Sequence, residues 1–280
     1  MEVFAPIIQL FNVAIVNPII NVLVAIYQAL SALGVPYALG FSIIGLTIVI
    51  RIILYPLISA QLRASKKMQA LSPHLSNLKA KHKGDKKRIQ EETMKLYKEH
   101  GVNPAAGCLP VLIQLPVIWG LYNVLNNIVK LDPEKLVNYI NGIVIDPIKI
   151  QKAWDTFFFG IPLGQSPSQM METAPVVAIA IPIITGVLQF LQSKMIFPGK
   201  PKSPKGAASG GKSDDFASVF QSQATYIFPI MIGFFSFTFP IGLSLYWNTF
   251  TVFGIIQQYK IGGLGGLEDL WQKTKKLRKS

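Results

Sequence analysis

Residues 37–59 read YALGFSIIGLTIVIRIILYPLIS, an almost unbroken apolar run that decides the fold. As a helix, about 20 such residues are enough to cross the hydrocarbon core of a lipid bilayer. Arg51 lies near the middle of the run, where a charged side chain costs roughly 2.5–3.5 kcal/mol on the milder insertion scales. An arginine at this depth normally faces protein or water rather than lipid, so the surroundings of Arg51 become the central question.

The composition is typical of a protein that crosses a membrane several times. Of the 280 residues, 50% are hydrophobic, and several apolar runs are longer than a soluble core helix or strand requires. The sequence therefore predicts an all-α membrane protein with five transmembrane helices. The predicted spans are residues 37–59, 104–129, 173–196, 224–239 and 243–261, the last two joined in a tight hairpin by Pro240, Ile241 and Gly242.

Three of the predicted spans contain a similar short segment with a proline near its start. These segments are LPVLIQ at residues 109–114, IPIITG at 181–186 and FPIMIG at 228–233. Each proline removes one backbone hydrogen bond and can bend its helix. The similarity is weak, and the sequence alone assigns it no role.

The first 36 residues carry no basic residue, so they lack the positive segment of a cleavable signal peptide. We expect them to lie outside the cell. Residues 19–33 are apolar but carry polar residues such as Asn21 and Gln28, which is typical of a helix lying in the membrane interface. A sixth membrane span over residues 1–33 is the alternative.

The net charge of +13 is distributed unevenly. Residues 61–103 carry eleven lysines and arginines against four acidic residues, and residues 194–215 carry five against two. Residues 259–280 carry six against two, ending in KTKKLRKS, whereas residues 130–172 carry four against five. Positively charged loops remain in the cytoplasm, so the N-terminus is predicted outside and the C-terminus inside a bacterial plasma membrane.

The basic segment 60–103 is predicted to form a cytoplasmic helical hairpin. Ser72, followed by a proline, and Asp85 are expected to cap its two helices, and Gly84 and Gly101 to end them. Its charge fits attraction to anionic lipids, and a docking surface for partners such as ribosomal RNA is equally consistent with it.

The remaining segments are connections. Residues 197–223 are predicted to be a cytoplasmic linker and residues 262–280 a basic cytoplasmic tail. Residues 130–172 form an external loop, in which a short helix is expected after Asp132. Trp154 and residues 157–159 are interpreted as an anchor at the membrane interface.

Few polar residues are available to Arg51 within the predicted spans. Thr47 and Tyr55 share its helix face at a spacing of four residues, and Gln114, Gln189 and Asn248 lie in other spans. No aspartate or glutamate lies in any of the five. Arg51 would then be solvated by water, amides, hydroxyls and backbone carbonyls, which favours a wet cavity that accepts a negative partner. The alternative is a structural arginine that ties helices together through carbonyls.

Several stretches in this order resemble the YidC family of membrane protein insertases, in the form without a large external domain. They are IIGLTIVIRIILYPL at residues 43–57, NPAAGCLPVLIQLPVIWGLYN at 103–123, ITGVLQFLQSKM at 184–195 and FPIMIGFFSFTFPIGLSLYWNTFTVFGIIQQYKI at 228–261. The resemblance implies five helices around a hydrophilic groove. It also implies that Arg51 faces the groove and that Gln114, Gln189 and Trp247 line or flank it.

The function implied by the resemblance is insertion of proteins into the membrane. Polar tails of nascent membrane proteins would enter the positively charged groove, and their hydrophobic segments would be released into lipid. The expected groove residues are Arg51, Thr47, Tyr55, Gln114, Gln189, Trp247 and Asn248. Partners expected from the family are nascent membrane proteins, the Sec translocon and the ribosome, and no cofactor is expected.

Two other classes of function are weighed against this one. An anion-binding transporter or channel could also use Arg51, although the missing carboxylates argue against proton or sodium coupling. An enzyme is not expected, because the three histidines, His74, His82 and His100, all lie in the hairpin and form no HExxH motif. The single cysteine, Cys108, excludes an internal disulfide.

Overall fold

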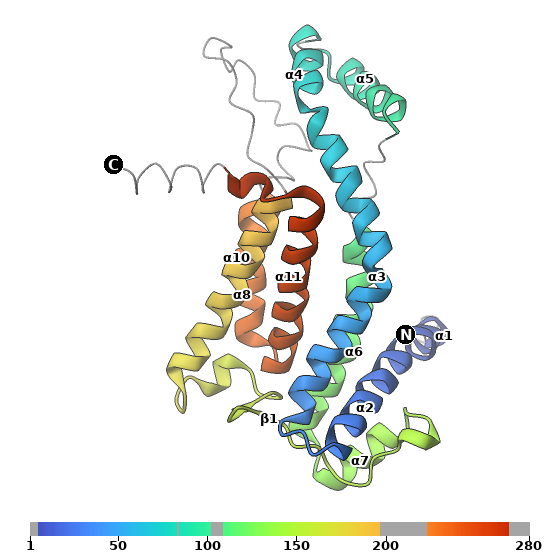
Figure 1. The fold of residues 1–280 in the computed structure, drawn as a ribbon, viewed down its shortest axis with the longest axis vertical. Helices are drawn as coiled ribbons and strands as arrows, with labels where there is room; N and C mark the ends of the chain where they lie inside the picture. Colours follow the sequence, from blue (N-terminus) through green and yellow to red (C-terminus); the bar gives the residue numbers. More distant parts are fainter. Residues whose placement is uncertain (1–4, 83, 102–108, 197–222, 269–280) are drawn as a thin grey trace. The chain divides into compact units, whose positions relative to one another are not determined.

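The computed structural model describes residues 5–82, 84–101, 109–196 and 223–268, and this part of the chain is mostly helical (Figure 1). It divides into two compact units, which are described separately. The first unit comprises the described residues of Met1–Ile53, Val111–Gln189 and Phe228–Phe253. The second comprises those of Leu54–Pro110, Phe190–Ile227 and Gly254–Ser280. Most of the predicted linker 197–223 and of the tail after residue 268 lies outside the described residues.

The N-terminal segment of the first unit is helical from Ala5 to Ala32. It consists of α1 (Ala5–Phe11), a π-helical turn η2 (Asn12–Val16) and α2 (Asn17–Ala32). Gly34 ends it in the left-handed conformation with φ of 71°, while the amide of Val35 bonds back to the carbonyl of Leu30. Residues Ile8–Ala32 are long and apolar enough to cross a membrane, so the alternative of a sixth span stays open.

Helix α3 (Ala38–Ala70) has 33 residues and contains the predicted span 37–59. At about 1.5 Å per residue it is about 50 Å long, against about 30 Å for a hydrocarbon core. The helix continues beyond Ser59 because residues 60–70, AQLRASKKMQA, are mostly strong helix formers. The first arm of the predicted hairpin therefore begins as a direct extension of this helix.

The hairpin of the second unit consists of α4 (Ser72–Lys81) and α5 (Lys86–Glu99) (Figure 1). Asp85 caps α5 as predicted, because its carboxylate accepts a hydrogen bond of 3.0 Å from the amide of Arg88. Gly84 and Gly101 both have positive φ angles, 93° and 62°, as expected for residues that end helices. Ser72 is the first residue of α4 rather than its cap, and Leu71 occupies the cap position.

The loop 130–172 folds into short elements packed within the first unit. They are α7 (Pro133–Asn141), η4 (Asp146–Ile148), a two-stranded antiparallel sheet of β1 (Phe157–Phe158) and β2 (Ile161–Pro162), and η5 (Pro167–Met170). The interpretation of Trp154 as an interface anchor is wrong, because this side chain is only 5% exposed and packs against Tyr27. Phe157 and Phe159 remain exposed, whereas Phe158 packs edge-on against Phe41.

Polar residues of α2 hold this loop in place. The side chain of Asn21 donates to the carbonyl of Ile143 at 3.3 Å and accepts from the amide of Ile145 at 2.9 Å. Gln28 donates to the carbonyls of Ile148 and Lys149, each at 2.8 Å. The polar residues that interrupt the apolar N-terminal segment therefore bind loop backbone, which explains their presence in an otherwise apolar helix.

Three further helices follow: α6 (Leu109–Lys130), α8 (Pro175–Ile196) and α11 (Ile241–Gly262). Between α8 and α11 lies α10 (Phe228–Thr238), preceded by the π-helical turn η6 (Gln223–Ile227), and η7 (Gly265–Leu267) follows α11. Only Phe239 and Pro240 separate α10 from α11, so the predicted connection is shorter by one residue and begins earlier. The first amides of α11 are satisfied by the loop: Ile241 bonds to Gln165 O and Gly242 to Leu163 O.

The similar segments at residues 181–186 and 228–233 meet where α8 and α10 cross. A Cβ atom on Gly233 would lie 3.2 Å from the carbonyl oxygen of Pro182, and one on Gly186 would lie 3.5 Å from that of Pro229. The contact is reciprocal, with each glycine facing the carbonyl of the other segment's proline. Small residues allow this close backbone approach, and close packing is what holds helices together in lipid.

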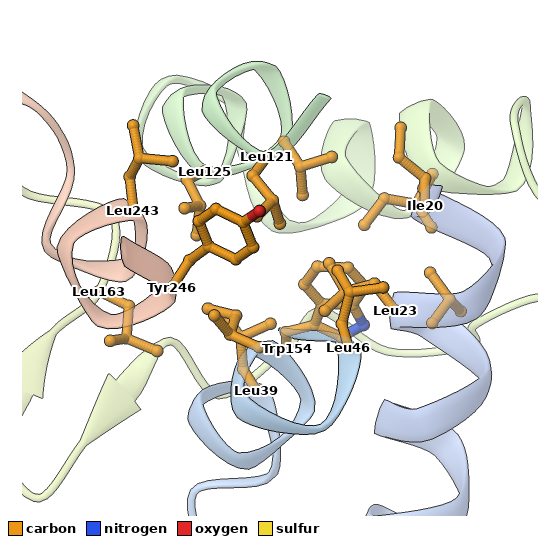
Figure 2. Close-up of a cluster of buried hydrophobic side chains, with 14 of the residues drawn as sticks. Ile20, Leu23, Leu39, Leu46, Leu121, Leu125, Trp154, Leu163, Leu243 and Tyr246 are labelled. Atoms are coloured by element: carbon orange, nitrogen blue, oxygen red, sulfur yellow. The ribbon is translucent and has the colours of Figure 1, made fainter. Parts of the chain in front are cut away.

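A single cluster of buried apolar side chains forms the core of the first unit. It draws on α2, α3, α6, α7, α11 and the loop before α8 (Figure 2). Leu39 and Leu46 of α3 face Leu23 of α2 and Trp154 of the loop, and Tyr246 of α11 lies beside leucines of α6. This core keeps α3, α6 and α11 together, and these helices carry most of the predicted groove residues.

By length and composition, three helices within the described residues can cross a membrane. They are Ile8–Ala32, Ala38–Met68 and Pro175–Ile196, and Thr225–Thr238 is a shorter apolar helix. The arrangement of five spans and the domain boundaries predicted from the sequence therefore stay predictions.

Candidate functional site

Arg51 is 2% exposed and lies on the buried side of α3 in the first unit. The apolar residues Leu39, Ile43 and Leu46 precede it on that side, and the exposed Ile52 and Ile53 follow it on the other. The helical period of 3.6 residues thus directs Arg51 inward, while its neighbours face outward. The expectation of a guanidinium surrounded by water is wrong for this structure.

An aromatic ring and a carbonyl take the place of water. The Cζ atom of Arg51 lies 3.4 Å from the ring centroid of Phe250, and one of its terminal nitrogens, Nη2, donates a hydrogen bond to the Phe250 carbonyl. The ring of Phe253 is farther away, with its centroid 5.8 Å from Cζ. The negative face of an aromatic ring attracts a cation, and this attraction is stronger where water is excluded. The carbonyl contact is the kind that the structural alternative predicted.

The charge of Arg51 nevertheless has no counter-charge within the described residues. No carboxylate in this part of the chain forms an ion pair with Arg51, and its Nε atom is buried without a hydrogen-bond partner there. A buried donor without a partner costs roughly 1–3 kcal/mol, and more when the group is charged. The site therefore retains both a positive charge and an unused donor that an anion could satisfy.

The two predicted neighbours of Arg51 on α3 differ from one another. Thr47 is fully buried, and its hydroxyl donates to the carbonyl of Ile43 at 2.6 Å, so it is engaged by its own helix. Tyr55 is 41% exposed and belongs to the second unit. Their common spacing is present in the helix, but the structure does not show these two side chains joining Arg51 in one polar group.

Gln114 of α6 reaches α11 through Tyr246. Its Nε2 atom donates to the tyrosine hydroxyl at 2.5 Å, and Tyr246 itself is completely buried (Figure 2). The Tyr246 ring in turn stacks on Phe250, with centroids 5.9 Å apart. A continuous series of contacts therefore runs from Gln114 through Tyr246 and Phe250 to Arg51.

Gln189 and Trp247 form a second pair, which joins α8 to α11. The indole Nε1 of Trp247 donates to Oε1 of Gln189 at 3.0 Å, and both side chains are half-buried. Asn248 and Thr251 are also on α11, and the Oδ1 atom of Asn248 and the Oγ1 atom of Thr251 are buried without a partner in the described residues. The helix α11 thus carries several of the polar atoms in the first unit that have unused capacity.

Sequence reasoning did not single out Tyr246 and Phe250 as site residues. Both are engaged with predicted site residues, Tyr246 with Gln114 and Phe250 with Arg51. Their spacing of four residues puts them on one face of α11, and this was the available signal. No group of three or more histidine, cysteine, aspartate or glutamate side chains that could hold a metal is found within the described ranges.

Comparison with known proteins places the chain in a family. Residues 30–263 match the family described as "60Kd inner membrane protein". The chain is also 34% identical over 222 residues to a "Membrane protein insertase YidC" of Fusobacterium nucleatum, which covers 79% of this chain and 85% of the relative. The chain belongs to the YidC family.

Other relatives of this YidC-family chain come from bacteria and chloroplasts. It is 33% identical to "Membrane protein insertase MisCA" of Bacillus subtilis, over 80% of this chain and 70% of that protein. It is 32% identical to "Inner membrane protein ALBINO3, chloroplastic" of Arabidopsis thaliana, over 88% of this chain. That match spans 51% of ALBINO3, so the chain spans about half the length of some of its curated relatives.

A solved structure supports the same conclusion for the fold. The structure titled "Active YidC insertase crystal structure with the first transmembrane domain resolved" superposes with a TM-score of 0.53 at 26% identity. The superposition covers 85% of this chain and 44% of the solved chain. The predicted family membership is thus confirmed, together with a helical, multi-pass membrane architecture.

Proposed function

We propose that this YidC-family chain is a membrane protein insertase. Three of its relatives carry this word in their names or titles, including the bacterial YidC and MisCA proteins. Substrates would be nascent membrane proteins with one or two hydrophobic segments. The chain would receive a polar tail of such a protein and release the hydrophobic segment into lipid.

The observation that carries the mechanism is the uncompensated charge of Arg51. Its guanidinium is buried in a helix of membrane-spanning length, with no carboxylate partner among the described residues. Two opposite unit charges 4 Å apart attract by about 4 kcal/mol at an effective dielectric constant of about 20, before desolvation is subtracted. An acidic residue in a substrate tail would be held transiently rather than tightly.

The surrounding polar residues would form the walls of the proposed groove. Gln114, Gln189, Trp247 and Asn248 offer amide and indole groups that could replace water around a polar tail, and Thr47 and Tyr55 would extend the same helix face as Arg51. The hydrophobic segment of the substrate would leave along α8 and α11. Its transfer into lipid is favourable by roughly 25 cal/mol per Å² of apolar area removed from water.

The orientation and partners follow from charge. The basic segments 60–103, 197–223 and 262–280 would face the cytoplasm of a bacterial plasma membrane, with the N-terminus and the loop 130–172 outside. The basic hairpin of α4 and α5 would contact anionic lipids or the ribosome, and a Sec translocon could act beside the chain.

The test uses two substrates that differ only in the tail, one with two aspartates and one with two asparagines. Full-length protein in liposomes is compared with Arg51→Ala, Arg51→Lys and, as a control that removes an exposed charge, Lys152→Ala. Insertion of the aspartate substrate is expected to fall several-fold in Arg51→Ala, to recover largely in Arg51→Lys and to stay unchanged in Lys152→Ala. Equal insertion of both substrates by Arg51→Ala at normal protein levels would contradict the charge mechanism.

An anion-binding transporter or channel is the second candidate, and the relatives named above do not favour it. It makes a different prediction for the same liposomes. Chloride flux that depends on Arg51 without any substrate protein would support this alternative, whereas tight liposomes would count against it.

A further inference from the structure

We infer that Phe250 is a specificity-determining residue, which competes with the acidic substrate tail for Arg51. The inference rests on the proposed insertase function and adds a residue to it. The Phe250 ring lies 3.4 Å from Cζ of Arg51, and the carbonyl of the same residue accepts a hydrogen bond from the guanidinium. One residue therefore covers the charge with its ring and binds it with its backbone.

The geometry separates what a substrate can use from what it must displace. The Nε atom of Arg51 has no partner among the described residues, so a carboxylate could accept a hydrogen bond from it. Carboxylates often bind arginine through two parallel hydrogen bonds along one edge of the planar guanidinium. Because the side chain is only 2% exposed, a carboxylate reaches this edge only after a covering group has moved. The Phe250 ring is in contact with the guanidinium.

Neighbouring aromatic residues have different roles. The centroid of Phe253 is 5.8 Å from Cζ, near the limit of about 6 Å at which a ring still attracts a cation appreciably. Tyr246 stacks on Phe250 rather than on Arg51, and its hydroxyl is held by Gln114. Phe250 is therefore the aromatic residue with the largest direct effect on the charge, and Tyr246 supports the position of its ring.

The consequence is a threshold for substrate binding. A tail with a carboxylate offers Arg51 an ionic partner that is stronger than the ring, whereas a neutral polar tail does not. The ring would thereby keep Arg51 occupied between substrates and favour acidic tails over neutral ones. Loss of the ring would lower the threshold, while the backbone carbonyl would remain as a partner in any substitution at this position.

The experiment measures binding of a tail to the full-length protein in liposomes. Synthetic substrates carry a photocrosslinking group in the tail, beside either two aspartates or two asparagines, and the half-saturating concentration for crosslinking is determined. The variants are Phe250→Leu and Phe250→Met, which remove the ring, and Phe250→Trp, which keeps an aromatic face. Phe253→Leu removes the more distant ring of the same helix and serves as the matched comparison.

For the aspartate tail, Phe250→Leu and Phe250→Met are expected to lower the half-saturating concentration about threefold to tenfold, given the usual strength of a desolvated cation–π contact. Phe253→Leu should lower it less, and Phe250→Trp should stay within about twofold of the native protein. The asparagine tail should be unaffected. An unchanged value for the aspartate tail in the two ring-removing variants would overturn the inference, and so would equal changes for both tails.

Arg51→Ala in the same assay separates this inference from the proposed function. If Arg51→Ala abolishes the preference for the aspartate tail while Phe250→Leu changes nothing, the insertase mechanism stands and the role of Phe250 is wrong. If Arg51→Ala leaves the preference intact, the charge mechanism itself is wrong and the role of Phe250 fails with it.

Discussion

The indole Nε1 of Trp247 donates a hydrogen bond of 3.0 Å to Oε1 of Gln189 and so joins α11 to α8 within the first unit. Helix association in lipid depends on close packing and on such interhelical hydrogen bonds, because lipid tails are as apolar as leucine. The pair therefore has a structural role in addition to its place in the proposed groove.

Trp247→Phe tests that structural role. The substitution keeps an aromatic ring but removes the donor, so we expect the free energy of unfolding to fall by about 0.5–1.5 kcal/mol. The measurement is chemical unfolding in detergent micelles, with Trp119→Phe as control because Trp119 is 55% exposed. A double-mutant cycle with Gln189→Leu should give a coupling free energy of similar size, and additive effects would show that the bond contributes nothing.

Gly233→Leu tests the crossing of α8 and α10. Even a Cβ atom at this position lies 3.2 Å from the carbonyl oxygen of Pro182, so a leucine would force the helices apart. We expect a loss of about 1–3 kcal/mol in the free energy of unfolding. Ile230→Leu on the same helix, at a site that is 74% exposed, should change it by less than about 0.5 kcal/mol. Similar values for the two variants would argue against the close crossing.

Trp154 allows the ring and the indole N–H to be tested separately. Its Nε1 atom is buried without a partner in the described residues, whereas the ring packs against Tyr27 with centroids 5.2 Å apart. Trp154→Ala should cost about 3–5 kcal/mol through the cavity it leaves, and Trp154→Phe less than about 1.5 kcal/mol. If Trp154→Phe is as damaging as Trp154→Ala, the indole N–H has a partner of its own.

Asp85→Ala should weaken the start of α5 in the second unit. The carboxylate accepts from the amide of Arg88, and loss of such a cap costs about 0.5–2 kcal/mol. We expect faster hydrogen exchange of the first-turn amides of α5, with Asp85→Asn preserving most of the protection. The exposed Glu91 on the same helix provides the control, since Glu91→Ala removes a negative charge but no cap. Equal exchange in Asp85→Ala and Glu91→Ala would contradict the assigned cap.

Local features of the chain could be predicted well. The apolar run around Arg51 predicted a helix, and Asp85 and Gly101 predicted where α5 begins and ends, because caps and helical periods depend on neighbours within a few residues. Motif order along the chain was enough for the family. The extension of α3 to Ala70 was less evident, since the change from apolar to basic residues suggested a boundary that the backbone does not have.

The surroundings of Arg51 show where prediction from sequence ended. The sequence determined that a charged residue lies within a span-length helix and that no acidic residue lies in any of the predicted spans. Only the tertiary structure decided what covers the charge, because the ring and carbonyl of Phe250 come from a helix 199 residues away along the chain. The interpretation of Trp154 failed for the same reason, since its burial depends on α2. Spacing specifies which residues share a helix face, but packing between distant segments decides what that face meets.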